Sequence, residues 1–204
     1  MLFENLQTQI KSLDTSSISL SRQNLLQPLI DFIQPKVDAG QTIKLNFICT
    51  HNSRRSHLSQ VWAQALGYFY NIKKLFCYSG GTESTALFPA AAKALEASGF
   101  KVDSQTQTKN PLYDIGFAAQ HPPIKGFSKT YDHVENPKTA FAAILTCSQA
   151  DNDCPYIPGA EVRIPLPFED PKAFDNTSQQ AEKYIERSLQ IATELKYVFS
   201  NIKQ

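Results

Sequence analysis

The sequence predicts an α/β fold: a three-layer open parallel sheet flanked by helices, with an N-terminal helical hairpin and a strand-like insertion. From residue 42 onward, short apolar runs alternate with amphipathic segments. Strands that alternate with helices in this way pair in parallel, because each helix carries the chain back across the sheet. The expected strands cover residues 43–48, 74–78 and 142–147, and the helices between them cover 55–66 and 88–98.

Two helices are expected before the sheet begins. Apolar side chains recur every three or four residues over 2–13 and again over 22–38, which is the spacing of one helix face. Pro28 and Pro35 lie inside the second segment. Because proline removes a backbone donor, a kink or a shorter second helix is expected.

Two later helices have specific sequence signals. Pro89 near the start and Gly99 just after the end of an Ala-rich segment match the usual preference for proline in the first turn and glycine beyond the last. At the C-terminus, apolar residues recur at helical spacing and predict a helix that packs one stripe against the sheet. The stripe consists of Ala181, Ile185, Leu189, Ala192, Leu195, Phe199 and Ile202.

Residues from about 104 to 140 fit neither pattern. Prolines and glycines break any helix in this stretch, and alternation resumes only in short pieces, which predicts a strand pair or a long lid. The chain is therefore expected to divide into a helical extension over 1–41 and a domain over 42–204 that contains this insertion.

Composition limits the classes of function. The chain has 204 residues, 42% of them hydrophobic, and a net charge of +1, which argues against a protein built to cover nucleic acid or an anionic membrane. There is no apolar stretch of about 20 residues and no signal-peptide pattern, so a cytoplasmic protein is expected. Four cysteines are too few for a disulfide scaffold and suggest reduced thiols with redox or catalytic work.

One loop has the pattern of an oxyanion site with a nucleophile. Cys49 and Arg55 bracket five residues at the expected junction between a strand and a helix. Unpaired N–H groups at a helix N-terminus bind anions and favour a thiolate, and an arginine can donate two parallel hydrogen bonds to an oxyanion. The alternative is a small core cysteine. Besides Cys49, the residues expected around the anion are Thr50, His51, Asn52, Ser53, Arg54, Arg55 and Ser56.

A second pair of cysteines follows the last expected strand. Cys147 ends that strand and Cys154 comes after a polar stretch predicted to be a mobile loop. Strand ends line the ligand crevice in such sheets, so Cys147 is expected near Cys49 if its strand lies nearby. The alternative is a structural cysteine at 147 and an incidental one at 154. Cys77 lies inside a strand and is expected to be inert core.

Asp170 precedes Pro171 in an expected loop. A carboxylic acid aimed at an anion site can protonate a leaving group. The same dipeptide is also a common turn or helix-start signal, so both interpretations stay open on the residues alone.

Taken together, these motifs indicate a family. The chain resembles the low-molecular-weight protein tyrosine phosphatase superfamily and, within it, the thioredoxin-coupled arsenate reductases, over about residues 43–202 without the insertion. The resemblance lies in the Cys-x5-Arg-Ser loop of residues 49–56, the turn Ser79-Gly80-Gly81-Thr82-Glu83, the segment Cys147 to Pro155 and the dipeptide Asp170-Pro171.

The resemblance implies a reduction of arsenate by three cysteines. Cys49 would attack arsenate while Asp170 assists loss of water, Cys147 would attack Cys49 and release arsenite, and Cys154 would attack Cys147. The resulting disulfide would be reduced by thioredoxin. No tightly bound cofactor is implied.

Some residues depart from the family pattern. His51 stands where a small glycine is usual, and Arg54 adds a second cation that would tighten anion binding or point to solvent. Gln60 stands where some reductases use a glutamate to help hold potassium, so no metal is expected. The paired tyrosines of the phosphatase branch are missing after Pro171.

Two other functions remain open from the sequence. The first is phosphomonoester or phosphotyrosine hydrolysis, which needs Cys49, Arg55 and Asp170 but not Cys147 or Cys154. The second is a non-catalytic oxyanion or redox sensor that binds a partner protein. The sequence does not predict an oligomeric state.

Overall fold

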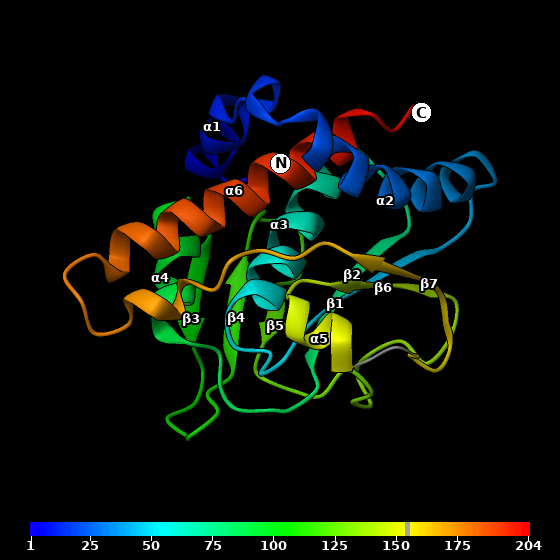
Figure 1. Cartoon of the computed structure of the whole chain (residues 1–204). Helices are drawn as coiled ribbons and strands as arrows, with labels where there is room; N and C mark the ends of the chain where they lie inside the picture. The colour runs from blue at the N-terminus through cyan, green and yellow to red at the C-terminus, as the bar shows by residue number, and fades with distance from the viewer. Residues whose placement is uncertain (154–155) are drawn as a thin grey trace.

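A four-stranded parallel sheet lies at the centre of the computed structural model, which describes residues 1–153 and 156–204 (Figure 1). Its strand order is β2-β1-β6-β7, and every neighbouring pair is parallel. The predicted fold class is confirmed. The strands are β1 (Ile43–Cys49), β2 (Leu75–Gly81), β6 (Phe141–Leu145) and β7 (Ala160–Pro165).

The two faces of this sheet are covered differently. On one face, β1 contributes buried Leu45 and Phe47 to a large apolar core beneath helices α2, α3 and α6. On the other face, Ile48 and Leu145 belong to a smaller buried cluster against which Tyr131 of the insertion packs. These helices are α2 (Leu20–Asp38), α3 (Arg55–Phe69) and α6 (Gln180–Ser200).

Both N-terminal helices are present, but they make little contact with each other, so the predicted hairpin is not a packed helix pair. Helix α1 (Glu4–Ser12) is joined to α2 by a 3-10 turn, η1 (Thr15–Ser17). The segment before α1 donates a backbone hydrogen bond from Phe3 to Phe117 of the insertion, whereas α2 packs on α6 and the sheet. Pro28 and Pro35 both lie within α2, which continues through them to Asp38.

Helix α3 is fixed to α6 by a buried aromatic residue. Trp62 is fully buried and donates from its indole Nε1 to Ser188 Oγ at 2.9 Å. Its ring meets Phe100 edge-on at 4.9 Å. Helix α4 (Pro89–Ala97) packs mainly on α6 and begins at the expected proline.

The insertion forms the predicted strand pair, β4 (Tyr113–Gly116) with β5 (Ile124–Gly126), and β3 (Lys101–Ser104) just before it adds a third strand to this second sheet. The antiparallel order of this sheet is β3-β4-β5. After β5 the chain returns to the central sheet, where Thr130 forms an isolated parallel bridge with Gly81 of β2. This return brings the insertion to the carboxyl edge of the parallel strands.

The segment after Cys147 differs from the predicted mobile loop. Residues Ser148–Asp153 form a short helix, α5. The helix is favoured because Ala150 is fully buried in the smaller cluster and its N–H faces Cys147 Sγ at 3.3 Å. Among the described helices, none is long and apolar enough to cross a membrane.

Candidate active site

The carboxyl end of β1 and the start of α3 form one continuous loop. Cys49 is the last residue of the strand and Arg55 the first of the helix, so the predicted junction between strand and helix is confirmed. The unpaired backbone N–H groups of the first turn of α3 therefore lie at the end of the loop that follows Cys49.

Asn52 and Ser56 hold this loop beneath the cysteine. Asn52 has a positive φ of 43°, a conformation that asparagine tolerates better than most residues. Its Nδ2 donates to Ser56 Oγ at 2.8 Å, and that oxygen lies 3.1 Å from Cys49 Sγ. Because the serine oxygen accepts from Asn52, its own proton is available to a thiolate at Cys49.

Arg55 brings the loop together with the predicted acid. Its NH1 donates to the carbonyl of Phe168 at 2.9 Å, and its NH2 lies 2.5 Å from Asp170 Oδ2. The Nε atom of Arg55 is buried and has no hydrogen-bond partner among the described residues. An oxyanion would give this donor a partner. Asp170 also caps the 3-10 turn η2 (Pro171–Phe174) by accepting from the N–H of Lys172.

Cys147 lies at the next strand end. β6 is the direct neighbour of β1, with Leu145 paired to Ile48. Cys49 and Cys147 are both buried in the smaller apolar cluster, and Thr50 Oγ1 lies 3.6 Å from Cys147 Sγ. The strand before Cys147 therefore lies next to the strand that ends at Cys49, which was the condition for the two cysteines to share one crevice. Cys154 lies outside the described residues.

Cys77 is away from this group. It lies in the middle of β2 and packs into the large core. Burial raises the pKa of its thiol well above the ordinary value. Such a thiol stays protonated and unreactive, as expected from the sequence.

Arg54 is buried, and its hydrogen bonds go to side chains outside the loop. Its Nε donates to Tyr184 OH at 2.5 Å, and its NH2 lies 2.5 Å from Asp175 Oδ2. The guanidinium also lies 4.2 Å from the centre of the Phe88 ring. The Arg54 guanidinium was expected to bind the anion or point to solvent, but it pairs with Asp175 instead. A buried guanidinium requires such a carboxylate partner.

His51 lies at the rim of the loop. Its Nδ1 is 3.3 Å from Glu83 Oε2, and both side chains are partly exposed. The backbone carbonyl of His51 accepts from Thr85 Oγ1 and from Ser128 Oγ. The side chain is directed to the turn after β2, whereas the carbonyl ties the loop to the insertion.

The insertion supplies residues that the sequence did not single out. The N–H of Lys129 donates to Asn52 Oδ1 at 2.9 Å, and its carbonyl accepts from Gly81. Ser128 Oγ accepts from the N–H of Thr85 while it donates to His51. We call residues 128–131 the strap. Its sequence has no motif, and only its pairing with Gly81 identifies it as part of the site.

Two buried titratable side chains lie beside the loop. Burial lowers the pKa of Lys129 to about 8. Burial, together with the charge of Lys129, lowers the pKa of His57 to about 3. His57 is therefore neutral at ordinary pH, while the ammonium of Lys129 lies 4.4 Å from the centre of the Phe127 ring.

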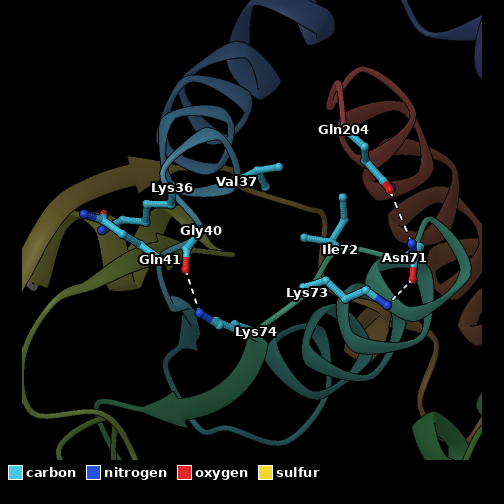
Figure 2. Close-up of a pocket in the computed structure, with 9 residues that line it drawn as sticks. All are labelled: Lys36, Val37, Gly40, Gln41, Asn71, Ile72, Lys73, Lys74 and Gln204. Carbon is cyan, nitrogen blue, oxygen red and sulfur yellow. Dashed lines mark hydrogen bonds between the residues drawn. The ribbon is translucent and has the colours of Figure 1, made fainter.

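Two cavities differ in their relation to this loop. One of about 500 Å³ adjoins it and is lined by His51, Ser53 and Phe88, with Lys109 and Lys172 at its margin. Another of about 300 Å³ opens at the opposite edge of the sheet, near the starts of β1 and β2 (Figure 2). Lys73 and Lys74 at that edge donate to Asn71 and Gly40, as the dashed lines show. Only the first of these two cavities is lined by residues of the anion loop, namely His51, Ser53 and Arg54.

Comparisons with known proteins agree with the geometry. No protein-family model matches the chain. Arsenate reductase of Bacillus licheniformis is 28% identical over 142 residues, which cover 69% of this chain and 83% of that protein. Arsenate reductase of Bacillus cereus is 29% identical over 126 residues, or 61% of this chain and 74% of that protein.

Solved structures show the same fold. A low-molecular-weight phosphotyrosine phosphatase from Vibrio cholerae superposes with a TM-score of 0.51 and 15% identity, covering 78% of this chain and 95% of that one. An arsenate reductase from Archaeoglobus fulgidus gives 0.50 and 15% identity, covering 77% and 99%. At this identity the likeness concerns the fold alone.

Proposed function

We infer from its curated relatives that the chain belongs to the low-molecular-weight protein tyrosine phosphatase superfamily, in its arsenate reductase branch, and we propose that it reduces arsenate to arsenite. One observation carries the proposal: Cys147 is buried in the same cluster as Cys49, at the neighbouring strand end. Hydrolysis of a phosphoester needs one thiol at this edge of the sheet, whereas a disulfide relay needs more than one.

The first step forms a bond between sulfur and arsenic. Arsenate binds to the N–H groups of the loop and to the free Nε donor of Arg55. The Cys49 thiolate displaces one arsenate oxygen. Asp170, which lies beside Arg55, gives that oxygen a proton so that it leaves as water.

The second step transfers two electrons to arsenic. The thiolate of Cys147 attacks the sulfur of Cys49, the sulfur–arsenic bond breaks, and its electron pair leaves with arsenite. Cys154 then attacks Cys147, which frees Cys49 and leaves a disulfide between residues 147 and 154. An external dithiol such as thioredoxin reduces this disulfide and restores the starting thiols.

A thiol count tests the relay without any reductant. Adding arsenate to the reduced protein should remove two thiols per chain and release one arsenite. Cys147→Ser should abolish both changes, whereas Cys77→Ala, which removes a buried thiol outside the site, should leave them intact. Turnover is then followed as NADPH consumption with thioredoxin and thioredoxin reductase. If Cys147→Ser and Cys154→Ser still turn over arsenate, the relay is wrong.

Phosphomonoester hydrolysis is a second candidate, favoured by the cavity of about 500 Å³ beside the loop. That space exceeds what one tetrahedral oxyanion fills. Phosphate release from p-nitrophenyl phosphate should then survive Cys147→Ser and be lost in Cys49→Ser. The comparison of this rate with arsenate reduction, on one preparation, decides which activity dominates. A protein inactive in both assays would be the oxyanion or redox sensor.

A further inference from the structure

Two consecutive arginines hold the two ends of one short segment. Arg55 is bonded to Phe168 and Asp170, where the segment begins. Arg54 is bonded to Asp175, which follows the 3-10 turn η2 and ends it. The segment that carries the proposed acid is therefore fixed to the anion loop at both ends.

The contact at Arg54 is a closed ring of hydrogen bonds. Arg54 Nε donates to Tyr184 OH, and that hydroxyl donates to Asp175 Oδ1 at 2.6 Å. Arg54 NH2 reaches the second oxygen of the same carboxylate. Tyr184 is fully buried on α6 and stacks on Phe88 at 5.5 Å, and Phe88 also lies under the Arg54 guanidinium. We call this group of four side chains the Arg54 anchor.

The two contacts differ in what an oxyanion does to them. A bound oxyanion that accepts two parallel hydrogen bonds from Arg55 takes one from Nε and one from a terminal nitrogen. It therefore competes with Asp170 or Phe168 for that nitrogen. The Arg54 anchor is not part of this competition, because Nε and NH2 of Arg54 are bonded to Tyr184 and Asp175 and neither contact involves Arg55. The Arg54 anchor therefore still holds the segment when Arg55 is bonded to the oxyanion.

From this difference we propose that Arg54 is a positioning residue, which keeps Asp170 over the anion loop while an oxyanion is bound. The inference rests on the proposed reaction, in which Asp170 donates a proton to the leaving oxygen. Proton transfer requires the carboxyl group within hydrogen-bond reach of that oxygen, and displacement by about 1 Å can cost on the order of 100-fold in rate.

Hydrogen exchange tests the anchor without any turnover. The probe is inorganic phosphate, and its occupancy is followed by protection of Cys49 from iodoacetamide. With phosphate bound, the amides of residues 168–175 should exchange at least about tenfold faster in Asp175→Asn and Tyr184→Phe than in the wild type. Exchange in β1 and β2 should stay unchanged. Equal exchange of 168–175 in all three proteins would overturn the proposal.

Kinetics test whether the anchor acts through the acid. At saturating arsenate, the rate of thiol loss should fall about 10- to 100-fold in Asp175→Asn and Arg54→Lys, with a similar half-saturating arsenate concentration. In an Asp170→Asn background the same changes should cause no further loss. Multiplicative losses in the double variants would show a merely structural role and refute the positioning.

A matched control breaks another ion pair on the same segment. Glu169 is exposed and pairs with Arg187 at 3.0 Å, so Glu169→Gln should match the wild type in exchange and rate. A wild type that loses no thiols to arsenate would refute the reductase proposal, and the exchange experiment would still decide on the anchor. Variants equal to an active wild type would refute the positioning role alone.

Discussion

At the scale of single residues, His57 links stability to acid pH. Its pKa is about 3 in the folded protein against an ordinary 6.5, because burial and the charge of Lys129 disfavour the imidazolium. Between pH 6.5 and 3 the unfolded chain binds a proton that the folded chain does not. The free energy of unfolding should therefore fall as the pH falls through this window, by up to about 1.4 kcal/mol per pH unit.

Urea unfolding of His57→Gln against the wild type checks this expectation. The variant should be less sensitive to pH between about 6.5 and 3. His121→Gln is the control, because His121 is only partly buried, near the surface of the insertion. If His57→Gln leaves the pH dependence of the free energy of unfolding unchanged, the lowered pKa of His57 is not its cause.

Lys129 should act in the opposite pH range. Its folded pKa of about 8 lies below the ordinary 10.5 because the side chain is buried. Between these values the unfolded chain binds more protons, so the free energy of unfolding should rise with pH. Lys129→Met should remove this rise and stabilise the protein at pH 7, where the wild type buries a charge. Thermal unfolding at pH 7 and pH 9.5 measures both effects, and exposed Lys125→Met is the control.

The sequence predicted several residues that the fold brings together around the anion loop, but not all of their contacts. Cys49, Arg55 and Asp170 could be predicted because the spacing of the first two, at a junction of strand and helix, and the dipeptide Asp170-Pro171 are recognisable motifs. Arg54 was misjudged because nothing in the sequence pairs it with Tyr184, which is 130 positions away. Lys129 was missed because the strap contributes mostly backbone groups, and these have no sequence signature.

At the scale of elements, the strap depends on two glycines of β2. A Cβ added to Gly80 would lie 2.3 Å from the Cα of Tyr131, and one on Gly81 would lie 2.6 Å from the carbonyl of Thr50. The bridge between Gly81 and Thr130 lies directly beside these contacts. The close approach of strap and loop therefore requires glycine at both positions.

Gly80→Ala should displace the strap while the parallel sheet stays folded. The expected result is a loss of oxyanion affinity of about tenfold, because the Lys129 bond to Asn52 no longer fixes the loop. Phosphate protection of Cys49 from alkylation measures it. Gly40→Ala, where a Cβ meets nothing within 4 Å but φ is positive, controls for general strain. Equal protection in both variants would contradict a role for the strap.

Periodicity predicted the elements of the central sheet well, because apolar strands and helix stripes must match a core. It failed for α5, whose polar sequence gives no helical pattern. That helix depends on tertiary burial of Ala150 against the cysteine cluster. The strand pair of the insertion, β4 and β5, was expected, whereas β3 before it was missed because its four side chains are mostly exposed and have no apolar alternation.

At the scale of the whole molecule, the N-terminal helices belong to the main core. Leu26, Leu29 and Ile33 of α2 are fully buried in the same cluster as Leu45 and Phe47 of the sheet. Removal of this helix would expose that layer to water. The segment over 1–41 was predicted as an extension, and helical spacing alone could not reveal that its apolar stripe completes the core.

Leu29→Ala should therefore destabilise the entire chain. The expected loss is about 2–5 kcal/mol in the free energy of unfolding, from lost burial and the cavity left behind. Leu25→Ala on the exposed side of the same helix should change stability by less than about 0.5 kcal/mol. Urea titrations of both variants provide the test, and equal midpoints would show that α2 is peripheral.

Trp62 is a natural fluorophore, and its contacts with Ser188 and Phe100 place it in the core. Trp62 is the only tryptophan in the sequence. It is fully buried on α3, and its indole N–H donates a hydrogen bond to Ser188 of α6. Its emission should be blue-shifted in the native protein and move to longer wavelength when the layers separate. Optical melting curves can thus follow the scaffold without a label.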